Sequence, residues 1–202
     1  GNQLGKNALS SVAVGGDVSQ LLAFLAIGFS GAGQVIIARL IGAKRHKEIG
    51  TFVGTMTGFL LAAALVVSVV GLLMRHTLLE LMHTPAEAYQ GALEYSAVCM
   101  VGLVFIYGYN IVSAILRGMG DSKHPFIFIS IAAVLNLLLD ILFVMGLNMG
   151  PAGAAIATVM SQAVSFIACS IFLLRHKEQF QLDVRPASFL HWNRPMLGNL
   201  LK

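Results

Sequence analysis

The chain has 202 residues, of which 57% are hydrophobic and 11% are charged, whereas an ordinary soluble domain carries about 25% charged residues. This composition excludes a soluble globular protein, a disordered chain and a nucleic-acid-binding domain. The 21 glycines and 5 prolines are typical of membrane-spanning helices, in which both residue types are more frequent than in soluble helices. We therefore expect a helical membrane protein, with a net charge of +4 whose placement reports its orientation.

Five apolar stretches are long enough to cross the hydrocarbon core, which is about 30 Å thick and needs about 20 helical residues. Their near-continuous apolar runs, such as residues 59–73, do not alternate with polar residues as the strands of a membrane β-barrel do. A helix also satisfies its backbone hydrogen bonds within the segment, as lipid requires. The predicted spans are residues 18–42, 51–74, 97–116, 125–149 and 152–174.

Basic residues gather at one end of these spans. Eleven of the thirteen lie in or beside the loops after the first and third spans and in the tail, and only Lys6 and Arg75 lie at the other end. Because cytoplasmic loops are enriched in Lys and Arg, these loops and the tail are predicted to be cytoplasmic. We then expect residues 1–16 to be an extracytoplasmic segment, 17–174 the membrane region and 175–202 a cytoplasmic linker. An exterior start without a signal peptide predicts a fragment that lacks at least one earlier span.

Asp140 is the only acidic residue well inside an apolar stretch, since Asp17 and Glu94 stand at span edges. A charge at the bilayer centre costs about 2.5–3.5 kcal/mol on insertion scales, so such residues usually face the protein interior and serve ions, protons or substrates. Asn136 lies one helical turn earlier, on the same face as Asp140. We interpret this pair as functional rather than as a simple hydrogen-bonding contact between helices.

The last predicted span carries a stripe of polar residues. Thr158, Ser161, Gln162 and Ser165 fall at helical offsets 0, 3, 4 and 7, so they share one face that should meet protein or water. Hydroxyl and amide side chains on spanning helices also join helices by hydrogen bonds. For this stripe a functional and a structural role are equally open.

Polar residues of the first and third spans have simpler interpretations. Ser30 and Gln34 lie near several glycines, which favours a close-packing face. Asn110 and Arg117 lie on a face that runs to the cytoplasmic end of the third span. Tyr95, taken alone, is typical of an anchor at the membrane interface.

One stretch imitates an enzyme motif. Residues 28–31 read Gly-Phe-Ser-Gly, like the Gly-x-Ser-Gly of intramembrane serine proteases of the rhomboid type, but all six histidines lie in loops, at helix ends or in the tail. A serine nucleophile needs a base within reach, so we predict no enzymatic activity. Cys99 and Cys169 lie inside apolar runs, where cysteine behaves as a small hydrophobe. They predict neither a disulfide nor a metal site.

Three motifs in chain order resemble the multidrug and toxic compound extrusion (MATE) family. They are residues 115–125 (Ile-Leu-Arg-Gly-Met-Gly-Asp-Ser-Lys-His-Pro), 136–140 (Asn-Leu-Leu-Leu-Asp) and 150–158 (Gly-Pro-Ala-Gly-Ala-Ala-Ile-Ala-Thr). Residues 8–14 and 42–48 add support in the family's order and spacing. The resemblance therefore covers essentially the whole chain.

This resemblance implies an all-α integral membrane protein of two six-helix lobes, a multi-pass protein of the bacterial inner (plasma) membrane. It implies a secondary active antiporter that exports cationic or amphipathic drugs in exchange for H⁺ or Na⁺ by alternating access, with no cofactor beyond the coupling ion. The chain would supply helices two to six of the N-lobe. The first helix and the C-lobe of the same protein would complete it.

The resemblance also implies roles for single residues. Asp140 stands where proton-coupled members have a helix-five carboxylate that binds the coupling ion, and Asn136 matches its hydrogen-bonding partner. Thr158 matches a hydroxyl of helix six, and Tyr95 matches a helix-four tyrosine that closes the network. The sequence departs from many relatives at Ile141, where they have proline. Further candidate cavity-lining residues are Gln34, Asn110, Ser161 and Gln162.

Two alternatives to efflux predict features that differ from those of this sequence. A flippase of the wider superfamily, which moves lipid-linked oligosaccharides, would need Arg or Lys within the spans to meet an anionic headgroup, whereas Arg39 and Arg117 lie at cytoplasmic ends. A membrane scaffold without transport activity would scatter its polar residues. The shared faces of the polar residues favour a transporter.

Overall fold

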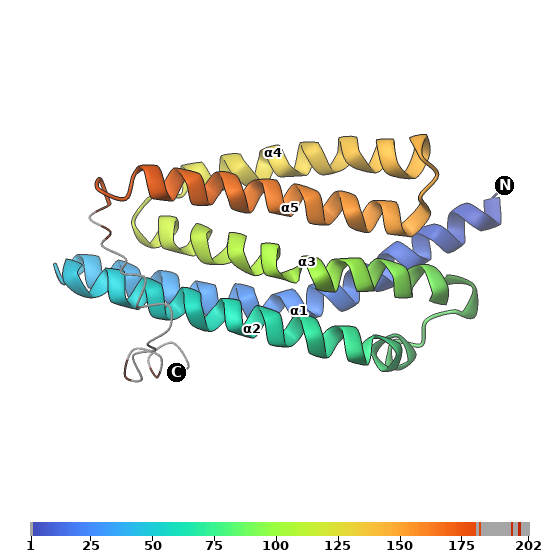
Figure 1. The fold of residues 1–202 in the computed structure, drawn as a ribbon, viewed down its shortest axis with the longest axis horizontal. Helices are drawn as coiled ribbons and strands as arrows, with labels where there is room; N and C mark the ends of the chain where they lie inside the picture. The colour runs from blue at the N-terminus through green and yellow to red at the C-terminus, as the bar shows by residue number, and fades with distance from the viewer. Residues whose placement is uncertain (1, 181, 183–194, 196–197, 199–202) are drawn as a thin grey trace.

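A computed structural model describes residues 2–180, 182, 195 and 198 of the chain. Its regular structure within these residues is entirely helical (Figure 1). A short π-helix, η1, continues directly from the fourth α-helix. The elements are α1 (Asn2–Gly42), α2 (His46–Leu81), α3 (Ala86–Gly118), α4 (Lys123–Asp140), η1 (Ile141–Gly146) and α5 (Gly150–Arg175).

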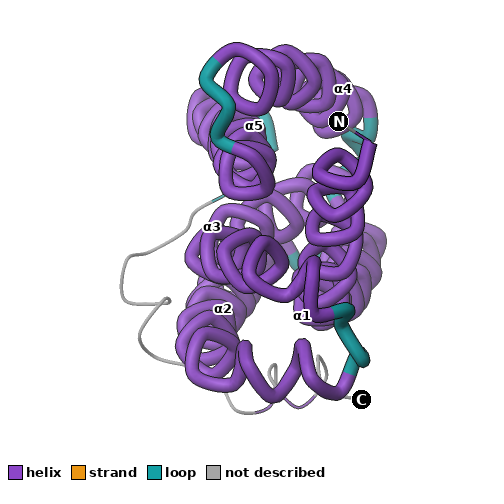
Figure 2. The backbone as a smooth tube through the Cα atoms, turned by 90° about the vertical axis from the view of Figure 1, so that its right-hand side faces the viewer, coloured by secondary structure: helices purple, strands orange, loops and turns teal. Residues whose placement is uncertain are grey.

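The five long helices lie alongside one another, and α3 is the central one. In the end-on view α3 lies between the α4 and α5 pair and the helices α1 and α2 (Figure 2). The most apolar 18-residue window of α3 is 61% buried, whereas that of α4 is 6% buried. Since α4 packs mainly against α5, it forms one edge of the described bundle.

Glycines on α3 allow α5 to approach closely. A Cβ added at Gly108 would lie 2.6 Å from Cε2 of Phe166, and one added at Gly102 would collide with the Val159 side chain. Small residues at such positions are typical of helix contacts in membranes, where packing rather than the hydrophobic effect brings helices together. The α3–α5 contact fixes the relative positions of the polar residues that the two helices carry.

The fold class is confirmed, since all five predicted spans coincide with helices that are long and apolar enough to cross a membrane. The first helix extends further than its span. The predicted span begins at residue 18, whereas α1 is continuous from Asn2; the extracytoplasmic position of residues 1–16 stays a prediction. Hydropathy marks only the apolar part of a helix, and residues 2–17 contain no proline to end it.

At 1.5 Å per residue, the 41 residues of α1 extend over about 60 Å, about twice the thickness of the hydrocarbon core. Residues 2–16 therefore belong to the same helix as the first span.

The fourth predicted span, residues 125–149, is divided. Its α-helix ends at Asp140 and η1 takes over, with the wider turns of a π-helix. The amide of Leu147 donates to the carbonyl of Leu142 at 2.9 Å, five residues back. A hydrophobic run of this length gives no sign of such a change. Most of the predicted linker, residues 175–202, lies outside the described residues.

Candidate functional site

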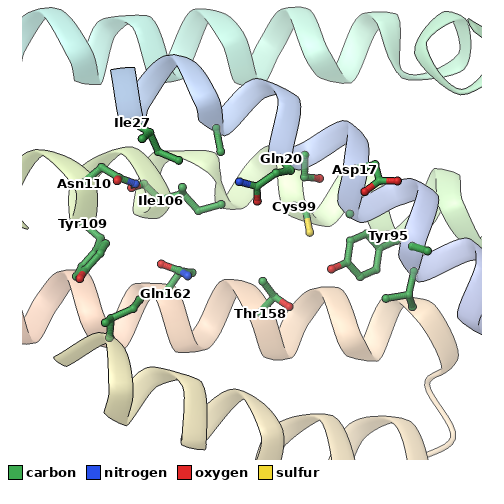
Figure 3. A pocket seen from close by; sticks show the side chains of 16 residues that line it. Asp17, Gln20, Ile27, Tyr95, Cys99, Ile106, Tyr109, Asn110, Thr158 and Gln162 are labelled. Carbon is green, nitrogen blue, oxygen red and sulfur yellow. The ribbon is translucent and has the colours of Figure 1, made fainter. Parts of the chain in front are cut away.

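A pocket of about 540 Å³ lies between α1, α3 and α5, with one residue contributed by α4. Four of the predicted site residues line it: Tyr95 and Asn110 from α3, and Thr158 and Gln162 from α5. Their side chains share the space between the three helices (Figure 3). The structure therefore brings together residues that are up to 67 positions apart in the sequence.

Helical spacing explains why these residues share one pocket. On α5, Thr158 and Gln162 are separated by four residues and so lie one turn apart on the same face. On α1, the lining residues Gly16, Gln20 and Ala23 follow each other at intervals of four and three. Each helix therefore contributes one stripe to the wall.

Asp140 does not line the pocket. It is the last residue of α4, and its Oδ1 is buried without a hydrogen-bond partner among the described residues. A buried polar atom without a partner costs free energy, and in a native structure it marks an atom that another group satisfies. A proton or a small cation can satisfy a carboxylate oxygen.

Asn136 and Thr158 connect the region of Asp140 to the pocket. The Nδ2 of Asn136 lies 3.5 Å from the Oγ1 of Thr158, a long hydrogen bond between α4 and α5. The Thr158 hydroxyl donates to the Ala154 carbonyl at 3.0 Å. Tyr95 is buried, and its hydroxyl is directed toward Thr158 and toward the Cys99 thiol. Thr158 thus belongs both to the pocket wall and to the contact that leads toward Asp140.

Gln34 and Ser161, two predicted cavity-lining residues, lie outside this pocket. The Oε1 of Gln34 accepts a hydrogen bond from Nε of Arg117 at 2.9 Å, and Arg117 also donates to the Ser113 hydroxyl at 2.5 Å. This contact joins α1 to the end of α3. The buried Ser161 hydroxyl donates to the Thr158 carbonyl at 2.9 Å within its own helix. In this structure the Gln34 side chain links two helices, and the Ser161 hydroxyl bonds within its own helix.

The sequence interpretation missed several pocket residues. Asp17, Gln20, Cys99 and Tyr109 also line the pocket. Asp17 was placed at a span edge because hydropathy alone defined the first span, although α1 continues beyond it. The three-residue spacing of Asp17 and Gln20 on a longer helix was the available signal.

Comparison with known proteins identifies the family. The MatE family model matches residues 2–142. The chain belongs to the MATE family. Probable multidrug resistance protein YpnP of Bacillus subtilis is 32% identical to it over 177 residues, which are 88% of this chain and 40% of YpnP.

Two further comparisons agree with this MATE assignment. Probable multidrug resistance protein YoeA of Bacillus subtilis is 28% identical over 206 residues, covering all of this chain and 44% of YoeA. A crystal structure of MATE in the bent conformation matches with a TM-score of 0.89 at 27% identity, over 96% of this chain and 43% of that one. The chain thus spans less than half the length of these relatives, as one lobe of a two-lobed transporter would.

Membership of the MATE family and the multi-pass membrane fold confirm two predictions from sequence. The roles assigned to Asp140, Asn136, Thr158 and Tyr95 stay predictions. The geometry adds that three of the four are in or next to one pocket wall, while the acid is not among the residues that line the pocket.

Proposed function

We propose that the protein is a secondary multidrug efflux antiporter that exports cationic or amphipathic compounds in exchange for H⁺ or Na⁺, in the bacterial plasma membrane. The described helices then correspond to helices two to six of its N-lobe, and the first helix and the C-lobe complete the transporter. The observation that carries the proposal is a substrate-sized pocket linked through Thr158 and Asn136 to the region of Asp140, an acid with one buried, partnerless oxygen.

The pocket has the character of a small-molecule site. Its volume of about 540 Å³ lies within the range of roughly 300–1,000 Å³ that is usual for ligand pockets. Most of its wall surface is apolar, and amide, hydroxyl and thiol groups and one carboxylate can fix a ligand's orientation. The names of YpnP and YoeA as probable multidrug resistance proteins support a drug-like ligand.

Asp140 supplies the coupling step in this proposal. Its partnerless Oδ1 binds the ion. Whether the ion is bound then determines which hydrogen bonds the neighbouring side chains on α4 can form. Because Asn136 is on the same helix and contacts Thr158 of the pocket wall, the ion alters the packing of α4 against α5. Coupling requires that ion and drug stabilise different conformations, since a ligand that binds both states equally shifts nothing.

The flippase alternative is less well supported. A carrier of lipid-linked oligosaccharides needs basic side chains that meet an anionic headgroup. Within the described part of the chain, the residues that line the pocket include no Lys or Arg. The pocket therefore suits a cation better than an anion.

Ethidium accumulation in cells that express the full-length protein tests the proposal. Wild type is compared with Asp140→Asn, with and without a protonophore and at two sodium concentrations. We expect low accumulation in wild type, which the protonophore raises if H⁺ drives export and sodium removal raises if Na⁺ does. Asp140→Asn should accumulate ethidium like cells without the transporter, because the coupling acid is lost.

Glu48→Gln is the matched control for this experiment. Glu48 is an acid at the start of α2 whose carboxylate pairs with Arg45 at 2.6 Å on the surface. It does not line the pocket. It should behave as wild type. Ion-dependent efflux that survives in Asp140→Asn would contradict the role of this acid. Accumulation in wild type equal to that in empty cells would contradict drug export and favour the flippase.

A further inference from the structure

Asp17 is the only charged residue that lines the pocket, as far as the described residues extend. The rest of the lining is apolar or carries neutral amide, hydroxyl and thiol groups. In a partly enclosed site, where the effective dielectric constant is lower than in water, one full charge outweighs several dipoles. Asp17 therefore sets the sign of charge that the pocket prefers.

Tyr95 packs against α1 at the two glycines that precede this acid. A Cβ added at Gly15 would lie 2.7 Å from Cδ1 of Tyr95, so only glycine lets the ring pack against the helix there. Gly16 faces the same tyrosine, and Asp17 follows directly. The carboxylate and the aromatic ring thus lie at the same end of the pocket (Figure 3). Because Tyr95 is 7% exposed, its ring supports this end of the wall, while the carboxylate of Asp17 supplies the charge.

The second acid, Asp140, has a different environment. It lies outside the pocket lining with a buried, partnerless oxygen, whereas Asp17 is exposed on α1 at the wall. A large organic cation in the pocket reaches Asp17 without displacing an ion at Asp140. The two acids are therefore suited to two separate tasks.

We propose that Asp17 is the residue that selects cationic substrates, by pairing its carboxylate with the charged group of an organic cation held in the pocket. This assignment rests on the proposed export function. It deepens that function by separating substrate selection from ion coupling. Coupling between drug and ion is then conformational rather than competition for one carboxylate.

Binding of ethidium, a permanent organic cation, to the purified full-length protein tests the assignment directly. Asp17→Asn should raise the dissociation constant about fivefold, the scale expected for loss of one partly exposed ion pair. In transport, the same variant should raise KM for ethidium while the maximal rate and the response to the ion gradient stay as in wild type. Asp17→Glu, which keeps the charge, should restore most of the affinity.

Glu94→Gln is the matched control. Glu94 lies on α3 near the same end of the bundle, and its carboxylate accepts from Nε2 of Gln90 at 3.0 Å, but it does not line the pocket. Its removal takes away one negative charge and should leave the dissociation constant unchanged. Equal affinities of wild type and Asp17→Asn would overturn the assignment and leave the export function standing. Wild type that binds no ethidium would overturn both.

Discussion

Among the five long helices, α3 is the most buried and α4 the least buried. Both are apolar enough to span a membrane, yet the most apolar window of α3 is 61% buried and that of α4 is 6% buried. α3 packs against α1, α2 and α5, whereas α4 packs mainly against α5. Hydropathy alone cannot distinguish them, because lipid and a protein interior are similarly apolar.

Under the proposed function, the difference separates a structural region from the region that couples ion and drug. The contacts of α3 are numerous, close and partly made through glycines. α4 carries Asn136 and Asp140 and passes into a π-helix right after the acid. It is bonded to pocket-wall residues by the long Asn136–Thr158 contact and by the bond from Tyr109 to the Pro125 carbonyl. Elements that move during function belong to the less tightly packed part of a fold. We expect substitutions of the buried core residues of α3 to act on stability and those around α4 to act on transport.

The largest expected effect is on packing around α3. Leu103 is 0% exposed in a cluster with Met100 and Tyr107, whereas Leu73 on α2 is 78% exposed. Leu103→Ala should lower the free energy of unfolding by about 3 kcal/mol because it leaves a cavity. Leu73→Ala should change it by less than about 0.5 kcal/mol. Thermal unfolding of the detergent-solubilised protein measures both, and equal shifts in Tm would contradict the central role of α3.

Local patterns predict the helices and most of the four pocket residues, whereas the site role of Tyr95 follows from the motifs that also indicate the family. Apolar length predicts a span, and the spacing of Thr158 and Gln162 predicts a shared face. What the sequence missed depends on contacts between distant segments. Asp17 joins the pocket only because α1 continues beyond its apolar part and Tyr95 packs against it. Gln34 does not line the pocket because its side chain accepts a hydrogen bond from Arg117, 83 residues away.

A smaller effect is expected where the two regions meet. Thr158→Val keeps the shape of the side chain but removes the hydroxyl that contacts Asn136. Loss of one such bond, at about 1 kcal/mol, should slow ethidium efflux about fivefold. Ser161→Ala is the control, because that hydroxyl bonds only within its own helix. Initial efflux rates are compared per amount of protein in the membrane, and equal rates for the two variants would show that the Asn136 contact does not matter.

The smallest expected effects are those of substituting two tyrosines that lie two positions apart on α3. They test the difference between the two regions most closely, because each tyrosine bonds to a different helix. Tyr107 donates to the Leu22 carbonyl of α1 at 3.0 Å, and Tyr109 donates to the Pro125 carbonyl of α4 at 3.0 Å. Each phenylalanine variant loses one hydrogen bond between helices, worth about 0.6 kcal/mol in a membrane. Tyr107→Phe should therefore lower Tm slightly and leave the efflux rate per folded molecule unchanged.

Tyr109→Phe should lower Tm by a similar small amount, because it loses a bond of the same length. It also releases the start of α4 from α3 and lies on the pocket wall, so the efflux rate per folded molecule should change as well. Measuring both quantities on both variants separates the two regions, since the lost bonds have the same length and chemistry. If both variants changed Tm alone, the hydrogen bond to α4 would be as structural as the bond to α1. The functional difference between the regions would then rest on Asp140 and its neighbours rather than on how loosely α4 is packed.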